Sequence, residues 1–109
     1  MENQQYLLSI DNGTQSIRAI VFNSQGQLLA KSKIDIEPYF SSQNGWAEQH
    51  PEYFWEKLCL ACQTLWQESS IDKQAIAAVS VTTQRATVVT LGKNHQPLRP
   101  AISWLDQRQ

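Results

Sequence analysis

The first 36 residues contain three short runs of strand-forming residues separated by turn signals. Residues 6–10 (YLLSI) end at the turn residues of 11–14 (DNGT), and residues 17–22 resume the apolar pattern before a second turn at 23–26 (NSQG). Residues 27–36 then alternate loosely between apolar and polar side chains. Short apolar runs bounded by Gly, Asn, Asp and Ser are typical of strands joined by tight turns. The sequence therefore predicts three consecutive antiparallel strands, a meander.

One amphipathic helix is expected after an irregular loop at 37–49. Pro51 suits the first helical position, because an amide proton there has no partner within the helix. Apolar residues follow at steps of three and four and so share one face that can pack on a sheet: Phe54, Trp55, Leu58, Cys59, Cys62, Leu65 and Trp66. The helix is expected to end near residues 68–70. Four members of the stripe are expected in the core, namely Trp55, Leu58, Cys59 and Cys62.

Three more strands are expected in the second half of the chain. Residues 75–81 (AIAAVSV) are mostly small or β-branched, which favours a buried strand in a sheet covered by helices. Residues 86–91 and 101–104 are further candidates, joined by the turn-rich segment 92–100. This order indicates an α/β fold in which a mixed sheet carries a packed helix. A sheet covered on both faces needs more helix than this pattern supplies, so we expect an incomplete domain.

The composition of the chain disfavours several classes of function. Nine Lys and Arg residues against ten Asp and Glu give a formal net charge of -1, without the basic excess expected of a surface that binds nucleic acid or anionic lipid. The sequence has no long apolar run and no signal-peptide pattern, so we expect a cytoplasmic protein with no membrane segment and no nucleic-acid partner. Cys59 and Cys62 lack the further ligands that a zinc site needs, which favours a role as small buried hydrophobic residues.

Residues 11–18 (DNGTQSIR) combine an acid, a glycine, two hydroxyls and a base between two expected strands. A glycine lets the backbone approach a phosphate closely, and the hydroxyls of Thr14 and Ser16 can donate to phosphate oxygens. Asp11, at the strand end, can hold Mg²⁺ directly or through water. An ordinary hairpin loop is the alternative, because Asn-Gly alone is a common turn signal. The Walker and Gly-x-Gly-x-x-Gly patterns are both absent from the sequence.

Four segments in order resemble the FGGY carbohydrate kinases. The first strand with residues 11–19 is similar to the family's first phosphate motif, an Asp-x-Gly-Thr turn within a ribonuclease-H-like (actin-like) domain. Residues 45–51 (GWAEQHP) resemble the Gly-Trp-x-Glu-x-x-Pro segment ahead of the first helix. Residues 81–87 (VTTQRAT) resemble the strand end that reaches the polyol in the glycerol-kinase branch, and residues 102–108 (ISWLDQR) resemble the Trp-x-Asp-x-Arg segment beside the sugar pocket.

The resemblance implies a role for each matching position. Asp11 would act on Mg²⁺ and its water shell, and Arg18 would offset the charge of the transferred phosphate. Arg85 would donate to substrate hydroxyls, Trp104 would supply an apolar wall, and Asp106 would accept from a hydroxyl. The last three also have structural alternatives: an ion-paired arginine, a core tryptophan and a local charge pair with a neighbouring arginine. The phosphate site would further be lined by Gly13, Thr14, Gln15 and Ser16, and the substrate site by Gln84.

The implied function is transfer of the γ-phosphoryl group of ATP, with Mg²⁺, to a hydroxyl of a sugar or polyol. Residues 1–109 would be the N-terminal portion of the family's N-terminal domain. The general base and the adenosine-binding domain would lie outside this chain, so no catalytic residue is expected within it and the fragment alone would be inactive. The alternatives are an actin-like module that binds a nucleotide or a partner protein, and a partly folded remnant that self-associates. Whether the full-length protein forms a homo-oligomer is left open.

The substrate-side segment departs from both branches of the family. Ala86 stands where the glycerol-kinase branch has a glutamate, so a carboxylate that would accept from a polyol hydroxyl is missing. An unmatched hydroxyl in a buried site costs about 1–3 kcal/mol, which disfavours glycerol. Arg85 and Ala86 also differ from the Gln-Met-His-Gly of the xylulose-kinase branch, so the sugar or polyol is left open. His50 and His95 are not expected to replace the general base.

Overall fold

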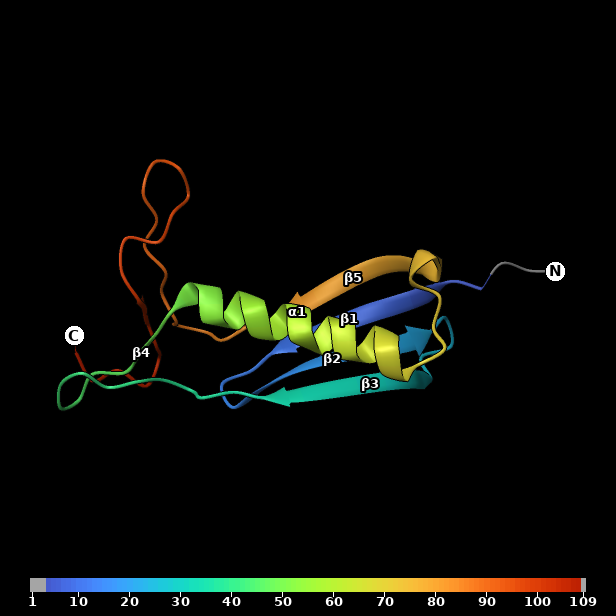
Figure 1. The fold of residues 1–109 in the computed structure, drawn as a ribbon, viewed down its shortest axis with the longest axis horizontal. Helices are drawn as coiled ribbons and strands as arrows, with labels where there is room; N and C mark the ends of the chain where they lie inside the picture. The colour runs from blue at the N-terminus through green and yellow to red at the C-terminus, as the bar shows by residue number, and fades with distance from the viewer. Residues whose placement is uncertain (1–3, 109) are drawn as a thin grey trace.

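The computed structural model describes residues 4–108 (Figure 1). Helix α1 lies along one four-stranded sheet, and the segments around the two shortest strands form an extension beyond the start of the helix. The elements follow the chain in the order β1 (Tyr6–Asn12), β2 (Ser16–Asn23), β3 (Leu28–Asp35), β4 (Glu48–Gln49), α1 (Pro51–Glu68), η1 (Lys73–Ala75), β5 (Ile76–Thr82) and β6 (Ala101–Ile102).

The main sheet has the strand order β3-β2-β1-β5. Strands β1, β2 and β3 pair antiparallel in succession, which confirms the predicted meander. Strand β5 pairs parallel with β1, so the sheet is mixed, as predicted. Because β1 and β5 run in the same direction, their carboxyl ends lie at the same edge of the sheet (Figure 1). Asp11 is the register partner of Thr82 there. The turn after β1 and the segment after β5 therefore start side by side.

The core lies between α1 and the sheet. Ile17, Val21 and Leu65 are the largest side chains that are fully buried there. The hydroxyl of Ser32 on β3 is buried and donates to the carbonyl of Ala61 on α1, so a hydrogen bond adds to the apolar contact between the two layers. The buried core cluster consists of Leu8, Ile10, Ile17, Ala19, Val21, Ile36, Ala61 and Leu65.

Part of the helix prediction is wrong. Leu58 and Cys62 pack against the core as predicted, and burial raises the pKa of the Cys62 thiol. Trp55, however, is 66% exposed, and Cys59 is only partly buried. The apolar stripe is wider than the surface that one helix presents to a sheet, so residues on its flank stay outside the contact centred on Leu65.

Strand β5 forms where it was expected, but the prediction that it is buried is wrong for the described chain. It is an edge strand that pairs with β1, and Val79 and Val81 are each 55% exposed. Helix α1 packs over β2 and β3 and leaves β5 uncovered. An apolar sequence therefore predicted the strand, whereas its burial depends on which elements lie beside it.

The last two predicted strands are shorter than expected. Residues 86–91 form no continuous strand and make only two isolated bridges, Val88 with Ile102 and Leu91 with Pro97. The strand expected at 101–104 is reduced to β6, which pairs antiparallel with β4 inside the predicted loop 37–49. Segments distant in sequence therefore hold the extension together, a pairing that local patterns do not reveal.

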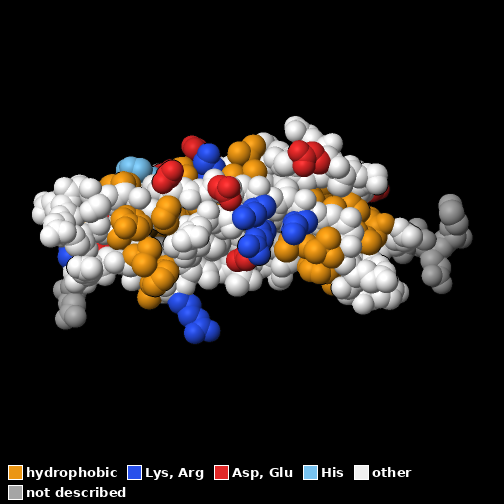
Figure 2. All heavy atoms as spheres, turned by 90° about the horizontal axis from the view of Figure 1, so that it is seen from below, with side chains coloured by type: hydrophobic (Ala, Val, Ile, Leu, Met, Phe, Trp, Pro, Cys, Tyr) orange, Lys and Arg blue, Asp and Glu red, His pale blue; other side chains and the backbone are white. Residues whose placement is uncertain are grey.

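Charges of both signs are mixed on the face seen in Figure 2, with apolar patches on either side of them. Lys33 and Asp35 form an exposed ion pair of 3.7 Å, a kind that contributes little to stability. No helix within residues 4–108 has the length and hydrophobicity needed to cross a membrane.

Candidate functional site

The turn between β1 and β2 is closed by its glycine. The backbone amide of Gly13 donates to the carbonyl oxygen of Ser16 at 3.0 Å. A Cβ atom at position 13 would lie 2.9 Å from that oxygen, closer than side chains approach a backbone, so this turn requires glycine. The same Cβ position lies 3.9 Å from Oδ1 of Asp11, which places the carboxylate beside the turn.

Hydrogen bonds connect this turn to two distant segments. Nε2 of Gln84 donates to the carbonyl of Gly13 at 2.9 Å, and Oγ1 of Thr87 donates to Oε1 of Gln84 at 3.0 Å. The Thr87 hydroxyl accepts from the backbone amide of Trp104 at 3.3 Å, and the Trp104 indole N–H donates to Oγ1 of Thr14 at 3.1 Å. Gly13, Thr14, Gln84, Thr87 and Trp104 thus form a closed circuit, called the site ring below.

The site ring contains one residue that the sequence analysis missed. The Thr87 hydroxyl donates to the Gln84 side chain and accepts from the Trp104 backbone amide. The sequence signal for Thr87 was its position in the motif of residues 81–87. Its bridging role could not be predicted from that motif, because it depends on the segment that carries Trp104. Ala86, just before it, adopts a left-handed φ of 60°, a conformation that costs a non-glycine residue on the order of 1 kcal/mol or more.

The other predicted phosphate-side residues lie at the same end of the sheet. Asp11 and Arg18 are register partners across β1 and β2, so both side chains point to one face. Gln15 and Arg18 are exposed and Ser16 is half-buried at the start of β2. Arg85 is exposed and lies three residues after the end of β5, next to Gln84 of the site ring. This end of the sheet therefore combines a carboxylate, hydroxyls and two exposed arginines.

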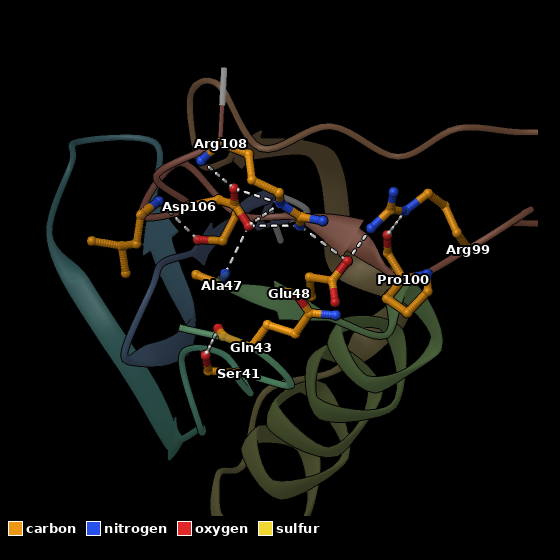
Figure 3. Close-up of polar contacts among 10 residues, drawn as sticks. Ser41, Gln43, Ala47, Glu48, Arg99, Pro100, Asp106 and Arg108 are labelled. Atoms are coloured by element: carbon orange, nitrogen blue, oxygen red, sulfur yellow. Dashed lines mark hydrogen bonds and ion pairs between the residues drawn. The ribbon is translucent and has the colours of Figure 1, made fainter. Parts of the chain in front are cut away.

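Asp106 does not join the site ring and lies in a carboxylate–arginine cluster (Figure 3). Its side chain is 2% exposed, accepts from the Ala47 amide at 2.7 Å and pairs with Arg108 at 2.7 Å. Arg108 also pairs with Glu48 at 3.1 Å, and Arg99 contacts the same Glu48 oxygen. The carboxylate expected to accept from a substrate hydroxyl is therefore engaged within the protein, and the alternative of a local charge pair is observed.

The ionic contacts of Asp106 predict a pH dependence of stability. The hydrogen bond from the Arg108 side chain, with further ones from the backbone amides of Ala47 and Arg108, holds the pKa of this carboxyl well below its ordinary value of 3.8. The folded state therefore binds the proton more weakly than the unfolded state. The charged Asp106 carboxylate therefore stabilises the fold fully above the ordinary pKa. This contribution is lost as the pH falls from about 4 towards the pKa of the folded state.

We expect Asp106→Asn to lower the thermal midpoint most at pH 7 and progressively less as the pH falls below about 4. Circular dichroism melts of parent and variant at stepped pH values measure this difference. Asp35→Asn is the matched control, because that side chain is 87% exposed. A difference between parent and Asp106→Asn that stays constant from pH 7 to pH 3 would contradict the role of the ionic contacts.

The residues of the turn fit a magnesium ion that is shared with a nucleotide. Within residues 4–108, no group of three or more His, Cys, Asp or Glu residues is placed to hold a metal ion. Mg²⁺ is usually held by one or two carboxylates together with substrate phosphates, rather than by protein ligands alone. A single carboxylate from Asp11 beside a glycine turn matches that donor set.

Comparison with known proteins supports the resemblance to the FGGY carbohydrate kinases. Residues 6–109 match the N-terminal domain of the FGGY family of carbohydrate kinases. The glycerol kinase of Coxiella burnetii is 38% identical over 104 residues, which cover 94% of this chain and 21% of that protein. The glycerol kinase of Nitrosomonas eutropha is 34% identical over 109 residues, which cover 99% and 22%. The chain thus spans about a fifth of the length of these relatives.

Solved structures share the fold. The xylulose kinase from Rhodospirillum rubrum matches with a TM-score of 0.84 at 24% identity, over 95% of this chain and 21% of that one. The Plasmodium falciparum glycerol kinase with ADP matches with a TM-score of 0.79 at 26% identity, over 96% and 21%. The predicted ribonuclease-H-like (actin-like) arrangement of a mixed sheet with a packed helix is confirmed. The chain belongs to the FGGY family of carbohydrate kinases.

Proposed function

We propose that the intact gene product transfers the γ-phosphoryl group of ATP to a hydroxyl of a sugar or polyol, and that this chain is the first portion of its N-terminal domain. The observation that carries the proposal is the site ring, which joins a glycine turn suited to phosphate to the segments of Gln84 and Trp104. A module that only bound a nucleotide would have no need to tie these substrate-side segments to the phosphate turn.

On the phosphate side, the residues of this chain would bind and neutralise charge. The turn closed by Gly13 lets the backbone approach phosphate oxygens, and the hydroxyls of Thr14 and Ser16 can donate to them. Arg18 would add positive charge, and Asp11 would hold Mg²⁺ directly or through water. When bound, that ion would neutralise charge on the phosphates. The general base would come from outside these residues.

On the substrate side, Arg85 and Trp104 would contact the sugar. Arg85 is exposed in the segment after β5, where its guanidinium can donate to hydroxyls. Trp104 is 50% exposed, so its side chain can contact a carbon chain although the indole N–H is bonded. Gln84 would orient the phosphate turn through Gly13. For Asp106 the cluster contacts favour a structural role, holding the segment that carries Trp104.

A coupled ADP-release assay on the intact gene product tests the proposal. We expect ADP formation with MgATP only when a subset of a panel of pentoses, hexoses and polyols is present. Glycerol belongs in the panel because relatives named glycerol kinase match the chain, although Ala86 offers no polar group to a hydroxyl. ADP release that is equal with and without every sugar would contradict the kinase and favour the nucleotide-binding module.

A further inference from the structure

We propose that Trp104 positions the Thr14 hydroxyl, so that the sugar side and the phosphate side of the site are energetically coupled. This inference rests on the proposed function and assigns Trp104 a second role besides that of an apolar wall. Its basis is the 3.1 Å hydrogen bond from the indole N–H to Oγ1 of Thr14, which joins residues 90 positions apart.

The direction of this hydrogen bond decides what Thr14 can offer a ligand. An indole N–H is a donor only, whereas a hydroxyl carries one proton and two acceptor lone pairs. Thr14 must therefore accept from Trp104, which occupies a lone pair and leaves the hydroxyl proton free. A hydroxyl held in this way is preset to donate, the polarity that a phosphate oxygen requires.

The backbone that carries the indole is anchored on both sides, which keeps the ring close to Thr14 before a ligand arrives. The Trp104 amide is bonded to Thr87, and the chain just after it is fixed where Asp106 accepts from Ala47. The Arg108 guanidinium lies 3.8 Å from the ring centroid of Trp46, which adds a cation–π contact to the same segment. Groups held in advance lose less entropy when they bind a ligand.

The coupling follows from the exposure of Trp104, which leaves its side chain accessible to a sugar. A sugar that contacts the indole restricts the motion of the ring and therefore stabilises the orientation of Thr14. The same bond lets bound phosphate restrict the indole from the other side. Coupling between two sites is reciprocal, so ATP must strengthen sugar binding by the same factor by which sugar strengthens ATP binding.

The test uses Trp104→Phe in the intact gene product, because phenylalanine keeps an aromatic wall and removes the N–H donor. We expect the KM for ATP to rise about three- to tenfold, as for the loss of one neutral hydrogen bond, while the KM for the sugar changes less. The factor by which sugar tightens ATP binding, measured by calorimetry, should fall towards one. Trp55→Phe, at an indole 66% exposed on α1, is the matched control.

A second pair of variants separates positioning from general damage to the fold. Thr14→Ser keeps the acceptor and should keep the coupling, whereas Thr14→Val should abolish it. In the Thr14→Val background, Trp104→Phe should have no further effect on the affinity for ATP, because the bond is already lost. Equal effects of Trp104→Phe in both backgrounds would overturn the inference.

Failure of the inference can be told apart from failure of the proposed function. If the parent forms ADP with a sugar but Trp104→Phe retains the full coupling factor, the kinase stands and the positioning role is wrong. If the parent forms no ADP with any sugar, the proposed function is wrong. In that case the Kd for ATP still tests the inference. An unchanged Kd in Trp104→Phe overturns the proposal that the indole orients Thr14.

Discussion

Replacing Asp11 with asparagine in the intact gene product is expected to lower the kcat of sugar-dependent ADP formation by about 10²–10³-fold, the usual effect of removing a group that stabilises transition-state charge. Asparagine has nearly the same volume and should preserve the register with Arg18 and Thr82. What it removes is the negative charge beside the glycine turn. Steady-state kinetics at several Mg²⁺ concentrations measure the effect, and the variant should also need more Mg²⁺.

The control for this experiment is Asp35→Asn on β3. That carboxylate is 87% exposed and pairs loosely with Lys33, so its loss should leave kcat unchanged. An Asp11→Asn enzyme whose kcat stays within threefold of the parent at all Mg²⁺ concentrations would remove Asp11 from the metal site. Such a result would leave the sugar dependence of the parent as separate evidence for the kinase.

Shortening Leu65 to alanine is expected to destabilise the domain by about 2–5 kcal/mol, the usual cost of a Leu-to-Ala cavity in a core. Leu65 is 1% exposed and lies between α1 and the sheet, in the cluster that contains Ile17 and Val21. Because α1 packs mainly on β2 and β3, the cavity would loosen the contact that holds the helix to the meander.

Urea titrations of parent and variant, followed by circular dichroism, measure this loss as a shift of the unfolding midpoint. Leu60→Ala is the matched control, since the same substitution on the same helix acts on a side chain that is 40% exposed. A Leu65→Ala midpoint no lower than that of Leu60→Ala would contradict the assignment of Leu65 to the core.

The meander and the helix could be predicted from the sequence because the forces that form them are local. Turn residues such as Gly13 and Gly26 stand where the chain reverses, and Pro51 marks the first residue of α1. The spacing of apolar residues also placed Leu58 and Cys62 against the sheet. These signals act within a few residues of one another, so a single sequence carries them.

Burial and pairing were harder to predict because they depend on neighbours that are distant along the chain. Trp55 belongs to the apolar stripe and still faces solvent, and Val79 belongs to an apolar strand that lies at a sheet edge. Strand β4, of two residues, pairs with β6, which lies more than 50 positions away in the sequence. Residue type alone distinguishes none of these cases.

The candidate site shows the same difference between local signals and contacts that are distant in sequence. The motifs singled out Gly13, Thr14, Gln84 and Trp104, and the structure brings these four residues together in the site ring. Thr87 was missed because its hydroxyl acquires two partners only when the segment of Trp104 is in place. The placement of Asp106 required knowing that Ala47 would approach it from another loop.

The span of the site ring also sets the order in which the protein can be assembled on the ribosome. The pairings of β1, β2 and β3 with one another and the packing of α1 on β2 and β3 involve only residues 6–68, so these contacts can form once about 70 residues have emerged, whereas β1 gains β5 later. The Thr14 hydroxyl gains its indole partner only after Trp104 has been synthesised, 90 positions later. A nascent chain is therefore expected to carry a folded meander with an open phosphate turn, and it completes that turn as the second half of the chain is translated.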